Sequence, residues 1–148
     1  MIFWLCACVF TPYRLEQAVH KYDAQTLVDF LQNGQHGYIR ERAALGLAQI
    51  SKKEPIPSAQ KALRSCLSQK NEFDYVRGAC AQTLAVWKDP QVADLIIQAL
   101  PSVDEETRYW MAYALKDLDL PQARAQLSAL RTDSDPLLSF AVRQWLEE

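Results

Sequence analysis

Apolar residues recur along most of the chain at the spacing of helices that bury one face. The segment 73–87 is the clearest case, because its small and apolar residues follow the spacing i, i+3, i+4, i+7, i+8 and i+11 of one buried stripe. These residues are Val76, Ala79, Cys80, Thr83, Leu84 and Trp87. No segment alternates apolar and polar residues with period two, so the pattern predicts helices and essentially no strand.

The periodic segments group into four helix pairs, preceded by a leading helix near residues 12–21. The expected pairs are 24–33 with 38–52, 58–69 with 73–87, 90–100 with 104–117, and 121–131 with 136–147. All seven prolines can be placed at helix starts or in connections, where the missing N–H costs little. We therefore expect an all-α chain, in which residues 1–22 form an apolar segment with a capping helix and residues 23–148 form a repeat domain.

An arginine stands near the start of three of the second helices, namely Arg40, Arg77 and Arg108. In register, the segments read YIRERAALGLAQI, YVRGACAQTLAVW and ETRYWMAYALKDL, so that one leucine position is shared by Leu47, Leu84 and Leu115. A weaker fourth copy, residues 136–146, places Leu138 at the arginine position and Trp145 at the leucine position. The arginines lie 37 and 31 residues apart, a period typical of stacked helix pairs in an α-solenoid.

These helices, each preceded by a short acidic or polar turn as in DYVRGACAQTLAVW and DEETRYWMAYAL, resemble the HEAT-like repeats of the phycobilisome-lyase type. The resemblance covers about residues 24–148. The sequence departs from the repeat pattern at Arg42, which takes a normally apolar position, and at Leu138, which takes the arginine position. The resemblance implies an α-solenoid of about four helix pairs that acts as a non-catalytic protein-interaction scaffold. The alternative is an accessory lyase or chaperone that acts on a bilin-bearing or otherwise modified protein.

Candidate binding residues lie on the second helices, where we expect a continuous inner face. Tyr109 and Tyr113 lie one turn apart and out of phase with the core stripe to which we assign Trp110, so both should face outward. Tyrosine and arginine are enriched at interface hot spots. The predicted binding residues are therefore Arg77, Arg108, Tyr109, Tyr113 and Lys116. Two alternatives remain open: the arginines form an internal ladder with neighbouring carboxylates and helix-end carbonyls, and the tyrosines belong to a plain solvated face.

Composition argues against several other classes of function. The net charge of −2 gives no general attraction to nucleic acid. The four cysteines form no CxxC pair and the two histidines lie in separate segments, so we expect no metal and no cofactor. No Ser-His-Asp arrangement, phosphate-binding glycine loop or HExxH is recognisable, and we expect no catalytic residues. Cys66 and Cys80 occupy core positions and are interpreted as small apolar fillers.

The first ten residues, MIFWLCACVF, are apolar but too short to span a bilayer and lack a basic leading region. Leu5-Cys6-Ala7-Cys8 resembles a bacterial lipobox. We expect a cytoplasmic protein; the alternative is a lipoprotein anchored through Cys8, if the true start lies upstream.

The expected partner is another protein. Membrane association through the N-terminal segment and self-association through the C-terminal repeat, around Trp145, are further hypotheses.

Overall fold

The computed structural model describes residues 3–51 and 55–147. Its elements, in chain order, are α1 (Phe3–His20), α2 (Ala24–Asn33), α3 (Gly37–Ile50), α4 (Pro57–Ser68), α5 (Asp74–Val86), α6 (Val92–Ala99), the short 3₁₀ turn η1 (Leu100–Ser102), α7 (Glu105–Lys116), α8 (Pro121–Leu130) and α9 (Pro136–Glu147). No strand occurs within the described ranges, and the helices pack in pairs. The expected all-α, HEAT-like solenoid is confirmed.

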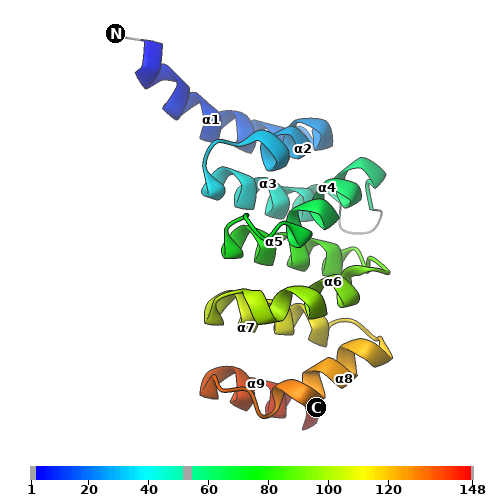
Figure 1. Ribbon diagram of the computed structural model, residues 1–148. Coiled ribbons are helices and arrows are strands. Elements are labelled where there is room, and N and C mark those ends of the chain that lie inside the picture. The colour runs from blue at the N-terminus through cyan, green and yellow to red at the C-terminus, as the bar shows by residue number, and fades with distance from the viewer. Residues whose placement is uncertain (1–2, 52–54, 148) are drawn as a thin grey trace.

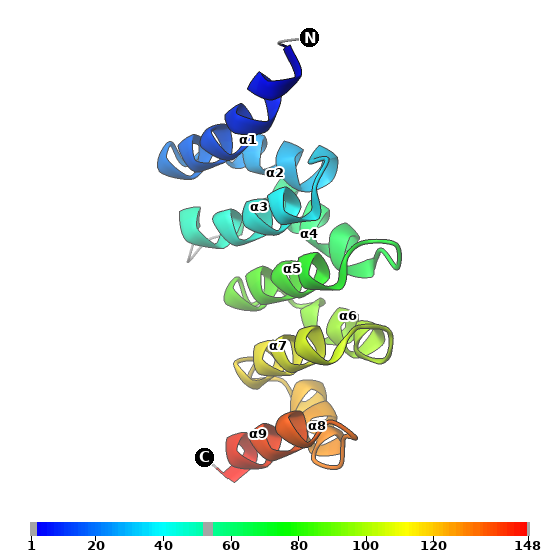
Figure 2. The same cartoon turned by 90° about the vertical axis from the view of Figure 1, so that its left-hand side faces the viewer.

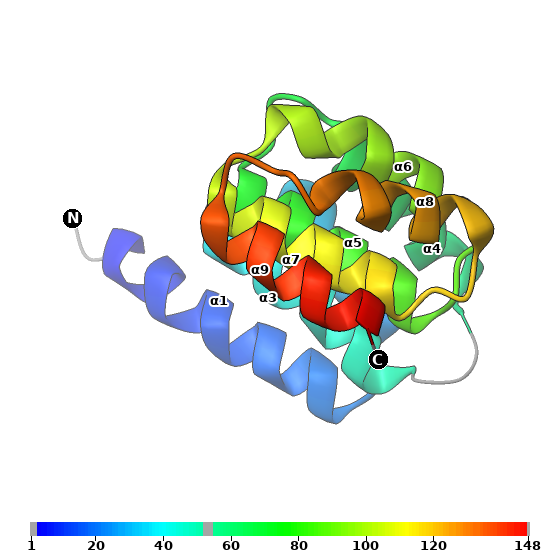
Figure 3. The ribbon, with the colours of Figure 1, turned by 90° about the horizontal axis from the view of Figure 1, so that it is seen from below.

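The helices form two parallel rows (Figures 1 and 3). One row holds the first helices of the pairs, α2, α4, α6 and α8, and the other holds the second helices, α3, α5, α7 and α9. Each helix contacts its own pair partner and the next helix of its row. Figure 2 shows the second helices stacked one above another like rungs, so residues of several repeats share a single face of the molecule.

The leucine position lies at the centre of this stack. Leu47, Leu84 and Leu115 are fully buried, which confirms their shared place in the register. α5 is covered by both neighbouring second helices and by α4 and α6. Small residues allow this close packing, because a methyl group added at Gly78 would lie 3.2 Å from Cγ2 of Thr107 on α7. No helix pair encloses its own apolar stripe, so the repeats stabilise one another.

α1 is longer than the expected leading helix. It begins at Phe3, and Pro12 therefore lies inside it, so the expectation that no proline falls within a helix is wrong at this position. An internal proline removes one helical hydrogen bond. α1 contacts α3 and α2, and its Leu15 and Ala18 are buried, so it extends the row of second helices at the N-terminal end. The lipobox hypothesis concerns side chains of residues 1–10, which lie outside those that the structure describes.

The fourth repeat is shifted by one residue from the expected register. α9 begins 31 residues after α7, and the same interval separates the buried Val142 from Met111. The arginine position of α9 is therefore occupied by Ser139, not by Leu138, and Trp145 lies beside the leucine position, not on it. The assignment of Leu138 and Trp145 to those positions is wrong, because the arginine position lies three residues after the first residue of each second helix and α9 begins at Pro136.

Candidate functional site: the second-helix face

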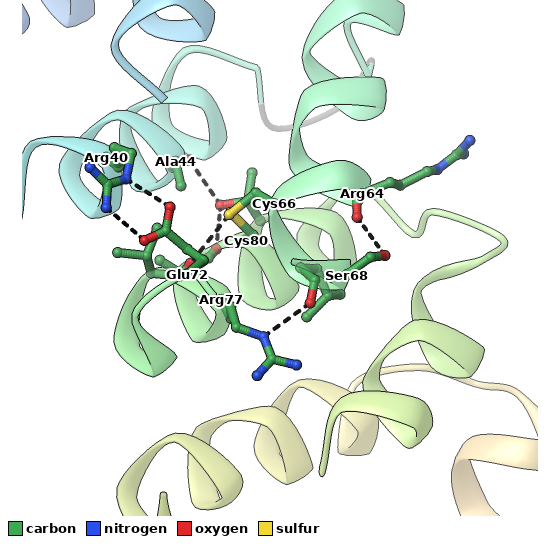
Figure 4. Close-up of a disulfide and its surroundings, with 12 residues drawn as sticks. Arg40, Ala44, Arg64, Cys66, Ser68, Glu72, Arg77 and Cys80 are labelled. Atoms are coloured by element: carbon green, nitrogen blue, oxygen red, sulfur yellow. Dashed lines mark hydrogen bonds and ion pairs between the residues drawn. A yellow bond between two sulfur atoms is a disulfide. The ribbon is translucent and has the colours of Figure 1, made fainter. Parts of the chain in front are cut away.

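Arg40 joins the first two repeats. Its guanidinium makes two hydrogen bonds of 2.7 Å to the two carboxylate oxygens of Glu72, in the turn before α5, and also donates to the Gly34 carbonyl at the end of α2. Figure 4 shows this forked contact. Burial raises the pKa of Glu72, but hydrogen bonds from Arg40 and from the Phe73 N–H, together with the Arg40 charge, hold that pKa below its ordinary value.

Arg77 repeats this role one repeat further on, but it is more deeply buried. Only 3% of its surface is exposed. Its Nε donates to the Leu67 carbonyl at the end of α4 at 3.2 Å, and both terminal nitrogens lie 3.3 Å from the Ser102 hydroxyl before α7. Asp74 adds an ion pair at 3.5 Å. Arg77 therefore does not lie on an exposed surface as predicted, because its donors face the contact between repeats and not solvent.

Arg40 and Arg77 form a ladder of contacts between repeats, and this pattern is not continued by the third arginine, Arg108. Arg108 is half-buried, and its Nε is buried without a hydrogen-bond partner among the described residues. In the last repeat, the Ser139 hydroxyl and Arg143 take the place of the arginine. Both donate to the Arg131 carbonyl at the end of α8, at 2.9 and 3.3 Å. In three of the four repeats, a carbonyl at the end of the first helix thus accepts a hydrogen bond from the second helix, but the donor side chains differ.

A second inter-repeat contact lies on the side of the first helices, and the sequence pattern did not reveal it. Asp89 is buried between repeats and accepts hydrogen bonds from Arg64 at 2.6 and 2.9 Å and from Gln60 at 3.0 Å. Its Oδ1 also accepts from the Gln91 N–H. An Asp-Pro pair usually indicates a helix start, so the sequence assigns Asp89 a local capping role and gives no sign of its contacts with Arg64 and Gln60.

Four rings from α7 and α9 form an aromatic cluster on the second-helix face. Its members are Tyr109, Trp110, Tyr113 and Trp145, with neighbouring ring centroids 5.5–6.2 Å apart and mostly edge-to-face. The Lys116 Nζ lies 5.9 Å from the Tyr113 ring and 6.0 Å from the Trp145 ring. Such contacts restrain large side chains, and of the four rings Trp110 and Tyr113 are the exposed ones.

Of the five predicted binding residues, the structure brings Tyr109, Tyr113 and Lys116 together in this cluster and leaves both arginines outside it. Tyr109 does not face outward as expected, because it is half-buried against the core and Trp145. Trp110 is not a core residue, since 44% of its surface is exposed. The core stripe of α7 passes through Ala112 instead. A second helix is covered on three sides, and its open side runs through Glu106, Trp110 and Tyr113.

Trp145 was expected at the open C-terminal end of the stack, but it packs back against α7. The large apolar side chains that remain exposed on α9 are Leu137 and Phe140. Trp145 is thus only partly exposed, and self-association through the C-terminal repeat stays a prediction. The sequence did not place Trp145 in the cluster, because the expected register of α9 was off by one residue and assigned Trp145 to the core.

Cys66 and Cys80 are buried as expected, but they are not free apolar fillers. They form a disulfide between α4 and α5, with their Cα atoms 6.5 Å apart (Figure 4). The crosslink spans 14 residues of sequence and fixes the second pair. Cysteine spacing in the sequence gave no sign of it, since the contact depends on how the two helices cross. Among the described residues, no group of three or more histidine, cysteine, aspartate or glutamate side chains is placed to hold a metal ion.

Two rows of paired helices and a shared second-helix face define an α-solenoid whose surface is built by neighbouring repeats. The profile of the HEAT-repeat family matches residues 61–147, which is more than half of the sequence. The chain therefore belongs to the HEAT-repeat family. No curated protein matches the sequence. None of the described helices is long and apolar enough to cross a membrane.

Proposed function

We propose that this chain is a non-catalytic protein-interaction scaffold and that its binding surface is the second-helix face around the aromatic cluster. HEAT repeats commonly serve as protein-interaction scaffolds. The observation that carries the proposal is the exposure of Trp110 and Tyr113, at 44% and 40%, in a cluster held by Tyr109, Trp145 and Lys116.

Physical chemistry supports a binding role for this cluster. Tryptophan and tyrosine dominate interface hot spots because they bury a large area at little cost in conformational entropy. Here the supporting rings limit that cost further, since the exposed side chains are already positioned before a partner arrives. The cluster also spans α7 and α9, so a partner would contact two repeats at once.

The test is a double substitution, Trp110→Ala with Tyr113→Ala. We expect affinity for a partner captured from the native cell to fall by at least about 1–2 kcal/mol, the range for interface anchors. Tyr13→Ala, at an exposed site on α1, is the matched control. Unchanged affinity of the double variant, measured by titration calorimetry on folded protein, would contradict the proposal.

A second candidate is the accessory lyase or chaperone implied by the resemblance to phycobilisome-lyase-type repeats. It is favoured by a cavity of about 430 Å³ at the N-terminal end, between α1, α2 and the start of α3. Arg14, Asp29, His36 and Tyr38 are among its lining residues, so polar groups converge there. A bilin mixed with the protein should shift its visible absorption if this candidate is correct; the scaffold hypothesis predicts no shift.

The two candidate locations are the cytoplasm and, for a lipoprotein anchored through Cys8, the membrane surface outside it. The Cys66–Cys80 disulfide supports a location outside the cytosol, because disulfides persist in oxidising compartments and are rare in the cytosol. The protein is isolated from its own cells, unfolded and alkylated. Cys66 and Cys80 should then stay unmodified until a reductant is added. If both cysteines are alkylated without reductant, the cytoplasmic expectation is favoured instead.

A further inference from the structure

A groove crosses the second-helix face from α3 over α5 to α7. Its volume is about 320 Å³, and its floor is formed by small residues of α5, including Gly78 and Ala79. The lack of a side chain at Gly78 has two effects. It lets α7 approach closely, and it keeps the middle of the groove open.

The walls of the groove carry negative charge. Glu41 from α3 stands on one side, and Glu106 from α7 and Asp104, the residue before α7, stand on the other. No lysine or arginine lies among the described residues that line it. Asp104 caps α7 by accepting from the Thr107 N–H at 2.7 Å, whereas Glu41 and Glu106 form no ion pair with any described residue. The charges of these two carboxylates are thus available to a positively charged group.

Two exposed rings complete the groove. Tyr75 stands at the α3 side, where its ring stacks on Phe73, and 43% of its surface is exposed. Trp110 stands at the α7 side and also belongs to the aromatic cluster. Aromatic faces attract lysine and arginine, and the attraction strengthens when the cation is partly removed from water. The groove and the aromatic cluster therefore form one continuous surface that meets at Trp110.

We propose that this groove receives a lysine or arginine side chain from a basic segment of the partner protein. The inference rests on the proposed scaffold function and specifies the chemistry of its partner. The aliphatic part of the side chain lies along the Tyr75 and Trp110 rings above Gly78. Its charged end lies between the Glu41 and Glu106 carboxylates. The charge complementarity is local, because the net charge of the whole chain is only −2.

The first experiment uses a defined probe, a fluorescein-labelled peptide of alternating lysine and serine, with the fully acetylated peptide as its uncharged counterpart. We expect fluorescence polarisation to show saturable binding of the lysine peptide alone, weakened by salt. Glu41→Gln with Glu106→Gln should weaken binding by about tenfold or more. Glu16→Gln with Asp94→Asn removes the same charge at exposed sites on α1 and α6 and should have little effect. Equal losses in both double variants, or equal binding of both peptides, would overturn the proposal.

A second measurement separates this inference from the function on which it rests. Capture of the native partner is compared between the Glu41/Glu106 variant and the Trp110/Tyr113 variant, with circular dichroism confirming that both are folded. Loss in both variants supports the groove. Loss only in the Trp110/Tyr113 variant would overturn the groove and leave the scaffold proposal intact. If neither variant loses the partner, both proposals fail.

Discussion

At the scale of single residues, a fully buried leucine occupies the same position in three of the second helices, α3, α5 and α7. Leu84 belongs to α5, which contacts helices on every side except the open face. Leu84→Ala should therefore lower the free energy of unfolding by about 2–5 kcal/mol, since it leaves a cavity that the neighbours cannot fill. Chemical denaturation measures the change. Leu137→Ala, at an exposed position of α9, is the control and should change stability by less than about 0.5 kcal/mol.

Arg77 gives a second prediction at this scale. Its removal leaves the Leu67 carbonyl and the Ser102 hydroxyl without their charged donor in a buried contact. Arg77→Ala should lower stability by about 1.5–3 kcal/mol, the range for hydrogen bonds to charged groups, and leave partner affinity unchanged once the folded fraction is corrected. Thermal melts and calorimetric titration of the same variant measure the two effects. A variant of normal stability with lost affinity would place Arg77 in the binding site after all.

The Arg40–Glu72 pair predicts how stability responds to acid. Because the folded-state pKa of Glu72 is lowered below its ordinary value of 4.5, its contribution is present above that value and is lost as pH falls through the folded-state pKa. The stability difference between wild type and Glu72→Gln should thus be constant near neutral pH and shrink below about pH 4.5. Urea denaturation across this range tests the sign. A difference that grows on acidification would contradict the pairing.

At the scale of helices, the segment 1–10 is predicted to be dispensable for folding. The described buried residues of α1 are Leu15 and Ala18, both beyond this segment. A chain that starts at Thr11 should keep its helical circular dichroism and its melting temperature, and it should be more soluble because an apolar run has been removed. Unfolding of this truncated chain would show that the segment belongs to the core.

The elements themselves were largely predictable from the sequence, because the apolar period of 3.6 and helix-start residues are local signals. Asp104, for example, caps α7, and Pro57, Pro121 and Pro136 each begin a helix. Which side of a second helix stays open was not predictable in the same way. That depends on the helices stacked on either flank, and it explains the misplacement of Trp110. The Cys66–Cys80 disulfide and the Arg64–Asp89 contact likewise depend on helix crossing and loop paths.

At the scale of the whole molecule, stacking turns weak local features into one surface. Tyr75, Glu41 and Trp110 come from three different repeats, and none of them suggests a site alone. The rigid rows of helices hold them together, as expected for a solenoid whose repeats contact only their neighbours. Substitutions in the ladder should therefore affect the surface through stability, whereas substitutions on the open face should affect binding alone.

The most direct test of a binding role for the second-helix face is hydroxyl-radical footprinting of the full chain with and without its captured partner. Oxidation of a side chain reports its exposure to solvent. We therefore expect oxidation of Trp110 and Tyr113 to fall on binding, and oxidation of Tyr13 and Tyr22, exposed at the N-terminal end, to stay unchanged. Unchanged oxidation of Trp110 and Tyr113, with protection found elsewhere, would contradict the claim that the second-helix face binds the partner.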